Sequence, residues 1–161
     1  MASRPPVSDH TLDIAAEPAA IIEAFFSPAA LGEWWHAIRA VTTPRTMGVY
    51  AVEWAPTGIR DDVFGPLGGV LYGTVVDYKP SRGFLVAEAH WLPPESEPVG
   101  PMALHVECIA ISGVTGITKL RVMQTGGDDT PRWRHYYDIT TQGWTGSLAA
   151  LRTYLEAPQF S

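Results

Sequence analysis

Residues 131–156 read PRWRHYYDITTQGWTGSLAALRTYLE and carry the longest helical pattern in the chain. A proline opens the stretch and Pro158 follows its end, and both are positions that suit proline at helix boundaries. Apolar side chains recur at three- and four-residue steps and share one face: Trp133, Tyr137, Trp144, Leu148, Leu151 and Leu155. Gly143 and Gly146 predict a bend or a close backbone contact beside Trp144. The stretch predicts one long helix with a single apolar face.

Alternating polar and apolar residues upstream predict two β-hairpins. The first joins strands 70–78 and 84–91 through a turn at 79–83, and the second joins strands 102–111 and 116–125. Pairing Tyr78 with Leu85 places one set of side chains inside: Tyr72, Thr74, Val76, Ala87, Ala89 and Trp91. The second hairpin places Leu104, Val106, Cys108, Ala110, Thr118, Leu120 and Val122 inside and His105, Glu107, Lys119 and Arg121 outside. We therefore expect an antiparallel sheet with one apolar face.

The N-terminal part of the chain predicts a strand followed by two short helices. Residues 10–15 alternate as a half-buried strand does, and helix starts follow at Pro18 and at Pro28, where Ser27 is the N-cap. The remaining segments are strands 37–43 and 49–55 and two long loops, 56–69 and 92–101. The first loop contains several glycines and prolines, and we expect it to act as a lid.

Length and composition predict one domain and exclude several classes of protein. The chain has 161 residues, of which 46% are hydrophobic, and we expect a flexible leader at 1–9, a single domain at 10–157 and a tail at 158–161. A net charge of -6 without a basic cluster argues against nucleic acid as a partner. The single cysteine, Cys108, favours a cytoplasmic protein. No stretch has the length of a membrane span or the pattern of a signal peptide.

A long helix laid across a curved sheet leaves space between the two. Aromatic residues gather at the expected open end of that space: Trp54, Tyr72, Trp91, Tyr137 and Trp144. A concave, mostly apolar wall with a few polar groups is the usual form of a small-molecule site. The pattern therefore predicts a ligand cavity, and the alternative is that the rings interlock as a solid core.

Three segments of the sequence resemble one known family. Residues 14–18 and 24–35, IAAEP and AFFSPAALGEWW, resemble the opening of the activator of Hsp90 ATPase homologue-like proteins of the START-like (SRPBCC) superfamily. Residues 73–80, GTVVDYKP, and the segment from Gly143 to Leu155 are similar to the family's central segment and closing helix. The resemblance implies an α+β helix-grip fold, in which a curved antiparallel sheet wraps around a long C-terminal helix and two short helices follow the first strand.

The resemblance leaves the chemistry open, because the superfamily includes lipid carriers, hormone binders, polyketide cyclases and stress-related proteins. We predict that the cavity binds a small hydrophobic or aromatic ligand, lipid-like or polyketide-like, and that the chain is a monomer or a homodimer. The expected ligand-binding residues are Trp35, His36, Trp54, Tyr72, Thr74, Trp91, Cys108, Gln124, Tyr137 and Trp144. Two alternatives stay open: a cyclase or hydratase that uses the same cavity with a tyrosine as proton donor, and a chaperone-associated interaction protein of the stress response.

Other candidate chemistry is weaker. Glu88, His90, His105 and Glu107 gather on adjacent predicted strands and have metal-ligand side chains. Lys119 shares their outer face, which favours cross-strand charge pairing, and we predict no metal and no cofactor. Cys108 lies among apolar residues and is interpreted as a small buried side chain. No motif of a nucleophile elbow, a phosphate loop or a dinucleotide fold occurs, and catalytic residues stay unassigned.

Overall fold

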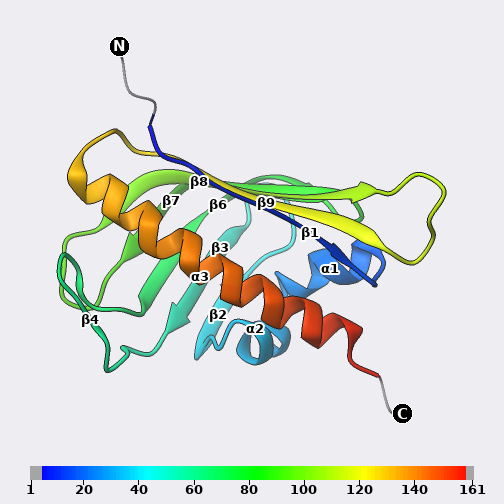
Figure 1. The fold of residues 1–161 in the computed structure, drawn as a ribbon, viewed down its shortest axis with the longest axis horizontal. Coiled ribbons are helices and arrows are strands. Elements are labelled where there is room, and N and C mark those ends of the chain that lie inside the picture. The colour runs from blue at the N-terminus through cyan, green and yellow to red at the C-terminus, as the bar shows by residue number, and fades with distance from the viewer. Residues whose placement is uncertain (1–4, 159–161) are drawn as a thin grey trace.

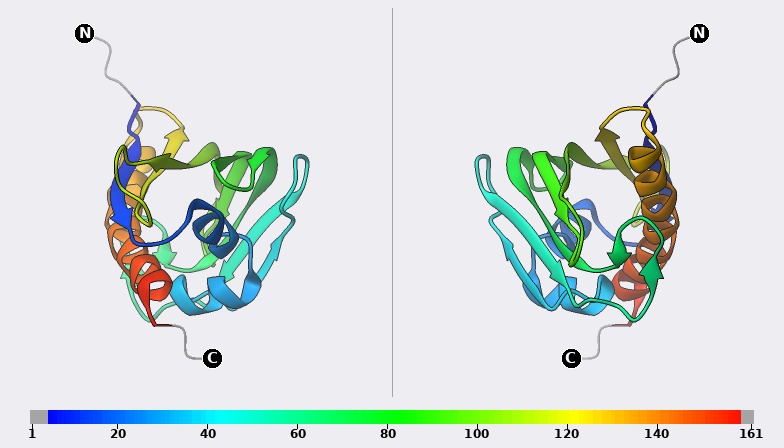
Figure 2. Two further views of the ribbon diagram at one scale, coloured as in Figure 1. Left: turned by 90° about the vertical axis from the view of Figure 1, so that its right-hand side faces the viewer. Right: turned by 90° about the vertical axis from the view of Figure 1, so that its left-hand side faces the viewer.

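A computed structural model describes residues 5–158 of the chain. A seven-stranded antiparallel sheet, in the order β1-β9-β8-β7-β6-β3-β2, curves around the long helix α3, and β4 and β5 form a separate hairpin (Figures 1 and 2). The elements are β1 (Ser8–Ile14), α1 (Pro18–Ala24), α2 (Pro28–Trp34), β2 (Arg39–Thr42), β3 (Val49–Trp54), β4 (Arg60–Asp61), β5 (Gly65–Pro66), β6 (Gly69–Lys79), β7 (Gly83–Leu92), β8 (Val99–Ala110), β9 (Thr118–Gly126) and α3 (Pro131–Glu156). The predicted α+β helix-grip fold is confirmed. Residues 1–4 of the predicted leader and 159–161 of the predicted tail lie outside the described residues.

Helix α3 begins and ends where its flanking prolines predict. Of its predicted apolar face, Tyr137, Trp144, Leu148 and Leu151 are buried and Trp133 and Leu155 are partly buried. Tyr136, which the predicted face left out, is also buried, with 4% of its surface exposed. The close contact expected beside Trp144 does not occur, because a Cβ at Gly143 or Gly146 would meet no atom within 4 Å. Both glycines are exposed, Gly143 at the open edge of a pocket described below and Gly146 on the outer surface.

Helices α1 and α2 close one end of the sheet and are held there by buried aromatic residues. The ring of Phe25, after α1, packs edge-on against Phe84 of β7 with 5.5 Å between ring centroids. The Tyr50 hydroxyl donates a hydrogen bond of 2.9 Å to the carbonyl oxygen of Phe25. The indole N–H of Trp34 donates one of 2.9 Å to the carbonyl oxygen of Ala24. Because buried polar groups are stable only when paired, these bonds fix both helices against the sheet.

The register of the β6–β7 pair differs from the prediction, since Tyr78 lies opposite Phe84 and not Leu85. The pairing with β7 is irregular between Val75 and Asp77, and an extra residue in a strand reverses the faces of every residue on its far side. Val75 and Leu71 are buried, with 0% and 7% of their surfaces exposed. The residues predicted to lie inside on this strand, Tyr72, Thr74 and Val76, therefore face outward. Their assignment to the cavity is wrong.

Strand β7 carries a bulge of its own. Glu88 adopts a left-handed backbone conformation, with φ at 52°, where the pairing with β8 is irregular between Val86 and Ala89. This bulge returns Ala89 and Trp91 to the inner face, as predicted. The prediction for Ala87 is wrong, because Ala87 lies opposite the outward Thr74. Gly73 of β6 sits against this region, and a Cβ there would lie 2.7 Å from Cγ1 of Val86. The close approach of the two strands requires glycine at this position.

The β8–β9 hairpin has the predicted register. Val106 pairs with Val122, and the inner side chains Leu104, Val106, Leu120 and Val122 are buried. On the outer face, Glu107 lies opposite Arg121. The Arg121 guanidinium donates two hydrogen bonds, of 3.0 and 2.7 Å, to the Asp9 carboxylate of β1. The charged outer surface expected for this half of the sheet is therefore present.

The other half of the outer face carries a cluster of apolar side chains beside the Arg39–Glu53 ion pair. The exposed side chains over β2, β3, β6 and the β2–β3 turn include Val41, Met47, Val49, Tyr72 and Val76. The ring of Tyr72 stacks on His90 of β7, with 5.4 Å between ring centroids. The bulge in β6 turns Tyr72 and Val76 outward and so adds them to this cluster.

The two loops predicted from glycine and proline content differ in the structure. Residues 56–69 contain the β4–β5 hairpin, whose tip carries the buried Phe64, with 1% of its surface exposed. We call residues 56–69 the lid. The second loop is shorter than predicted, because β8 already begins at Val99. Among residues 5–158, no helix is long and apolar enough to cross a membrane.

Candidate functional site

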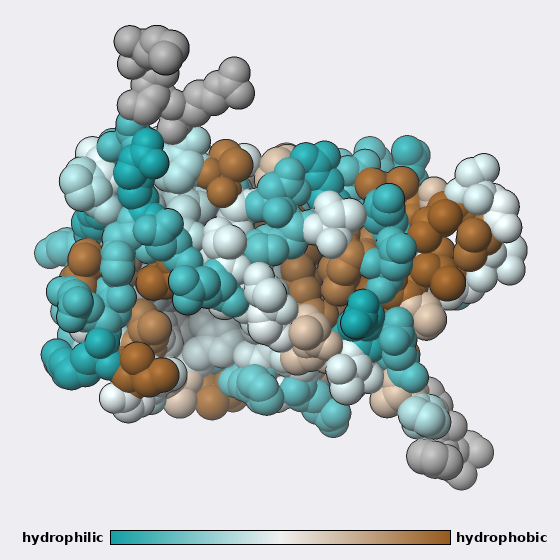
Figure 3. All heavy atoms as spheres, in the orientation of Figure 1, coloured by the Kyte–Doolittle hydropathy of each residue, from teal (hydrophilic) through white to brown (hydrophobic). Residues whose placement is uncertain are grey.

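A pocket of about 380 Å³ lies between α3 and the inner side of the sheet. The lid contributes Thr57, Leu67 and Gly68 to its wall, and α3 contributes a row of residues from Tyr136 to Ser147. Figure 3 shows a hollow beside the middle of α3 on this face of the molecule. The pocket thus lies where the curvature of the sheet and the straight helix leave space.

Four tryptophans from different parts of the chain line the pocket: Trp35, Trp54, Trp91 and Trp144. The Trp35 ring centroid lies 5.0 Å from that of Trp54 and 5.0 Å from that of Trp144. The indole N–H of Trp54 donates a 2.8 Å hydrogen bond to the Trp35 carbonyl oxygen, and that of Trp91 donates a 2.7 Å bond to the carbonyl of Gly68. Because their N–H groups are bonded within the protein, the rings of Trp54 and Trp91 offer apolar surface to the pocket.

A buried polar cluster lies against this aromatic wall. Gln124 of β9, with 2% of its surface exposed, accepts a 2.6 Å hydrogen bond at Oε1 from the Trp144 indole N–H. Its Nε2 donates to the Tyr136 hydroxyl at 3.1 Å, and this hydroxyl donates to Sδ of Met102 at 3.2 Å. We call Gln124, Tyr136, Trp144 and Met102 the Gln124 cluster. Burial raises the pKa of Tyr136 above its ordinary value, against the hydrogen bonds from Thr140 and Gln124, so the phenol is protonated at neutral pH.

The lid is anchored beside the pocket by its one buried ring. Phe64 packs edge-on against Trp91 with 5.1 Å between ring centroids, and its centroid lies 6.5 Å from that of Tyr136. The Arg132 guanidinium of α3 lies over the Phe64 ring at 5.2 Å. Trp91 and Tyr136 also line the pocket, so the position of the lid and the shape of the pocket depend on the same side chains.

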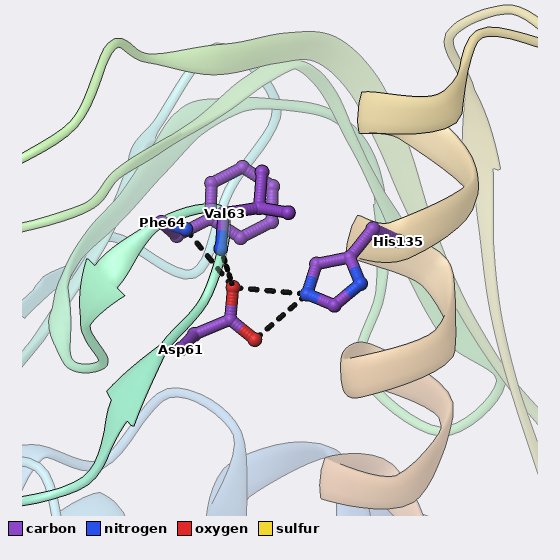
Figure 4. Close-up of polar contacts among 4 residues, drawn as sticks. All are labelled: Asp61, Val63, Phe64 and His135. Carbon is purple, nitrogen blue, oxygen red and sulfur yellow. Dashed lines mark hydrogen bonds and ion pairs between the residues drawn. The ribbon is translucent and has the colours of Figure 1, made fainter.

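A polar contact joins the lid to α3 (Figure 4). The Asp61 carboxylate accepts hydrogen bonds of 2.9 Å from the backbone N–H groups of Val63 and Phe64. Its two oxygens lie 2.7 and 2.9 Å from Nε2 of His135. Burial raises the pKa of Asp61, but the hydrogen bonds from His135 and from the two backbone groups outweigh it and hold this pKa below its ordinary value. Asp61 therefore carries a negative charge at neutral pH.

The fold is shared with solved structures of other proteins. The Aha1 dimer from Colwellia psychrerythraea superposes with a TM-score of 0.65 at 15% identity, over 96% of this chain and 99% of that one. An AHSA1 protein from Silicibacter pomeroyi gives 0.63 at 17% identity over 92% and 97%, and an HSP90 activator from Plasmodium falciparum gives 0.64 at 14% identity over 94% and 97%. The chain has the Aha1-like fold. No protein-family model matches the sequence, and no curated protein matches it.

Six of the ten predicted ligand-binding residues line the pocket: Trp35, His36, Trp54, Trp91, Gln124 and Trp144. His36 is exposed and has a left-handed backbone conformation, with φ at 58°, so it stands at the rim. The structure brings these six residues together from the segment after α2, from three strands and from α3. Their role in binding a ligand stays a prediction.

The other four predicted residues lie elsewhere. Tyr72 and Thr74 are on the outer face of β6, beyond the reach of the pocket. The Tyr137 hydroxyl donates a 3.0 Å hydrogen bond to the carbonyl oxygen of Gly126, and burial raises its pKa. Cys108 is half-buried against α1, where its Sγ lies 4.0 Å from the carbonyl oxygen of Pro18. Burial raises the pKa of this thiol to about 11.

Sequence reasoning missed Tyr136 and the apolar residues that the lid and β6 contribute, Leu67 and Leu71. Helical spacing contained a signal for Tyr136, which follows Trp133 by three residues and precedes Trp144 by eight. For Leu67 the sequence carried no signal, because the path of the lid is set by tertiary contacts. In the described part of the chain, no three His, Cys, Asp or Glu side chains gather as metal ligands do, and the predicted group around His90 and His105 is not such a site.

Proposed function

We propose that this protein binds a small hydrophobic or aromatic molecule in the pocket between the sheet and α3. The observation that carries the proposal is a pocket of about 380 Å³ walled by four indole rings beside one buried polar cluster. This volume lies in the range of small-molecule sites, and apolar walls with few polar groups are typical of them. The single free cysteine fits the cytoplasmic setting that we also propose.

Two glycines on α3 provide a matched test. Gly143 lines the pocket and Gly146, one turn further along the helix, does not. A Cβ at either position meets no atom within 4 Å, and leucine is a better helix former than glycine, so both variants are expected to fold. Gly143→Leu places a side chain at the pocket wall, whereas Gly146→Leu adds the same side chain to the open surface.

The measurement is binding of N-phenyl-1-naphthylamine, a neutral apolar fluorophore, to the full chain. We expect the wild type and Gly146→Leu to bind with equal affinity and Gly143→Leu to bind at least about tenfold more weakly, since the leucine occupies ligand space. Equal binding by all three proteins, or none by the wild type, would refute the pocket as the site. Mass spectrometry of candidate ligands recovered after incubation separates binding from the alternative cyclase or hydratase activity, which would return them altered.

The apolar cluster on the outer sheet face favours a second role, association of two copies of this chain. The patch of Val41, Met47, Val49, Tyr72 and Val76 is uncharged, and in a chain with a net charge of -6 such a face lets two copies approach with the least repulsion. The Colwellia psychrerythraea protein of the same fold is described as a dimer. Analytical ultracentrifugation of two variants tests this association. Val49→Lys places a charge in the patch and is expected to yield monomers. The control Val114→Lys places the same charge at an exposed site outside the patch and is expected to leave the association unchanged.

A further inference from the structure

Only one assignment of donors and acceptors is possible for the hydrogen bonds of the Gln124 cluster. An indole N–H can only donate, so the atom of Gln124 that faces Trp144 at 2.6 Å must be the amide oxygen. The amide nitrogen then faces the Tyr136 hydroxyl and donates to its oxygen at 3.1 Å. Since the oxygen of Tyr136 accepts from both Gln124 and the Thr140 side chain, the hydroxyl hydrogen must find another acceptor.

The acceptor that it finds is a weak one. The Tyr136 hydroxyl donates to the thioether Sδ of Met102 at 3.2 Å, and a thioether sulfur accepts hydrogen bonds poorly. Tyr136 itself is 4% exposed and lines the pocket, whereas Met102 stands behind it. A ligand oxygen that entered the pocket would offer this hydrogen a stronger bond than the sulfur does.

The pocket also limits the charge of the ligand. No Asp, Glu, Lys or Arg is among its lining residues in the described chain, and the one titratable group besides Tyr136 is His36 at the rim. An ionised ligand would lose its hydration without gaining a counter-ion. The four indole faces favour a flat ring system instead.

We propose that the ligand is a neutral aromatic compound with a carbonyl oxygen, and that this oxygen accepts the Tyr136 hydroxyl hydrogen in place of Met102 Sδ. This inference rests on the proposed function of the pocket and adds the ligand class and the residue that selects it. Tyr136 is then the specificity-determining residue, and Gln124 is a positioning residue that leaves the hydroxyl free to donate.

Three probes with one ring skeleton test the proposal: acetylnaphthalene, ethylnaphthalene and naphthoate. The first carries a neutral carbonyl, the second no acceptor and the third a charge. Equilibrium dialysis gives the Kd of each probe, and for each protein we take the ratio of the ethylnaphthalene Kd to the acetylnaphthalene Kd. The two probes differ in hydrophobicity, but this difference is the same for every variant and cancels when the ratios of two proteins are compared. In the wild type, naphthoate is expected to bind more weakly than acetylnaphthalene.

Two variants, Tyr136→Phe and Met102→Leu, and one matched control, Tyr137→Phe, complete the design. Tyr136→Phe should lower the ratio about fivefold to tenfold, which is the value of one neutral hydrogen bond. The control Tyr137→Phe removes the neighbouring buried hydroxyl, which donates to the Gly126 carbonyl, and should leave the ratio unchanged. Met102→Leu keeps the side-chain volume, removes the competing sulfur and should raise the ratio. This last variant keeps the test decisive if Tyr136→Phe does not fold.

A spectroscopic readout reports the bond directly. The carbonyl stretch of isotope-labelled acetylnaphthalene should shift to lower frequency when bound to the wild type and to Tyr137→Phe, and should lose that shift in Tyr136→Phe. An equal ratio in the wild type and Tyr136→Phe, or tighter binding of naphthoate, would overturn this inference while leaving the pocket function intact. If neither neutral probe binds the wild type, the proposed function fails as well.

Discussion

Nε2 of His135 lies 2.7 Å from Oδ1 of Asp61 and joins α3 to the lid, beside the buried ring of Phe64. The two residues are 74 positions apart in the chain. The side chain of Asp61 is 10% exposed and that of His135 is 32% exposed, so water screens this contact only in part. The pair therefore fixes the lid against α3 beside the pocket.

Replacing Asp61 by asparagine should weaken the lid in a pH-dependent way. The pKa of Asp61 is lowered in the folded protein from its ordinary value of 3.8, so its stabilising effect is fully present above about pH 4 and is lost as the pH falls through the lower folded value. At pH 7 we expect Asp61→Asn to be about 1 kcal/mol less stable than the wild type. Denaturant unfolding at several pH values should show this gap closing toward pH 3. A gap that is independent of pH would contradict the assignment.

Removing the Phe64 ring should open the lid without unfolding the sheet. Phe64→Ala leaves a gap beside Trp91, and the lid has few other buried side chains to hold it. We expect the backbone N–H groups of residues 63 and 64, which donate to Asp61, to exchange with deuterium at least about tenfold faster.

The neighbouring Val63→Ala variant is the control for the lid experiment, because the Val63 side chain is exposed. Its exchange rates should match those of the wild type. Faster exchange throughout the sheet in Phe64→Ala would show that the ring supports the whole fold rather than the lid.

Gln124→Met should be destabilising although methionine fits the same space. The change leaves the Trp144 indole N–H and the Tyr136 oxygen without their partner in a buried site. The expected cost is about 2 kcal/mol in the free energy of unfolding. Gln142→Met makes the same substitution on the exposed side of α3 and should change stability by less than about 0.5 kcal/mol. Equal stabilities of the two variants would show that the Gln124 cluster contributes nothing.

Cys108 should react slowly with alkylating agents. Burial raises its pKa from 9.0 to about 11, and the nearby Glu107 carboxylate adds to the shift. Since the thiolate is the reactive form, iodoacetamide should modify the native protein at pH 8 about 100-fold more slowly than the unfolded protein. Comparable rates for the two forms would place the thiol in water.

Local patterns determined most of the elements of this fold. Proline at helix starts located α1, α2 and α3, because proline fits the first turn and not the interior. Alternation located the strands of the β8–β9 hairpin and their inner face, because that pairing has no bulge. These signals act between residues that are close in the sequence.

The strand bulges and the path of the lid could not be predicted from such local signals. One extra residue between Val75 and Asp77 moved Tyr72 and Thr74 from the predicted cavity to the outer surface, and alternation cannot reveal such an insertion. The lid also places Phe64 beside Tyr136, with 6.5 Å between ring centroids, and local sequence patterns carry no signal for this contact.

The sequence by itself determined the α+β helix-grip architecture and the aromatic side chains available to a pocket. The tertiary structure alone decided which of them line it, because the strand bulges set which residues of β6 and β7 face inward. The physical reason is that helix and strand patterns follow from backbone preferences over a few residues, whereas a pocket is formed by segments whose relative position depends on the packing of the whole chain.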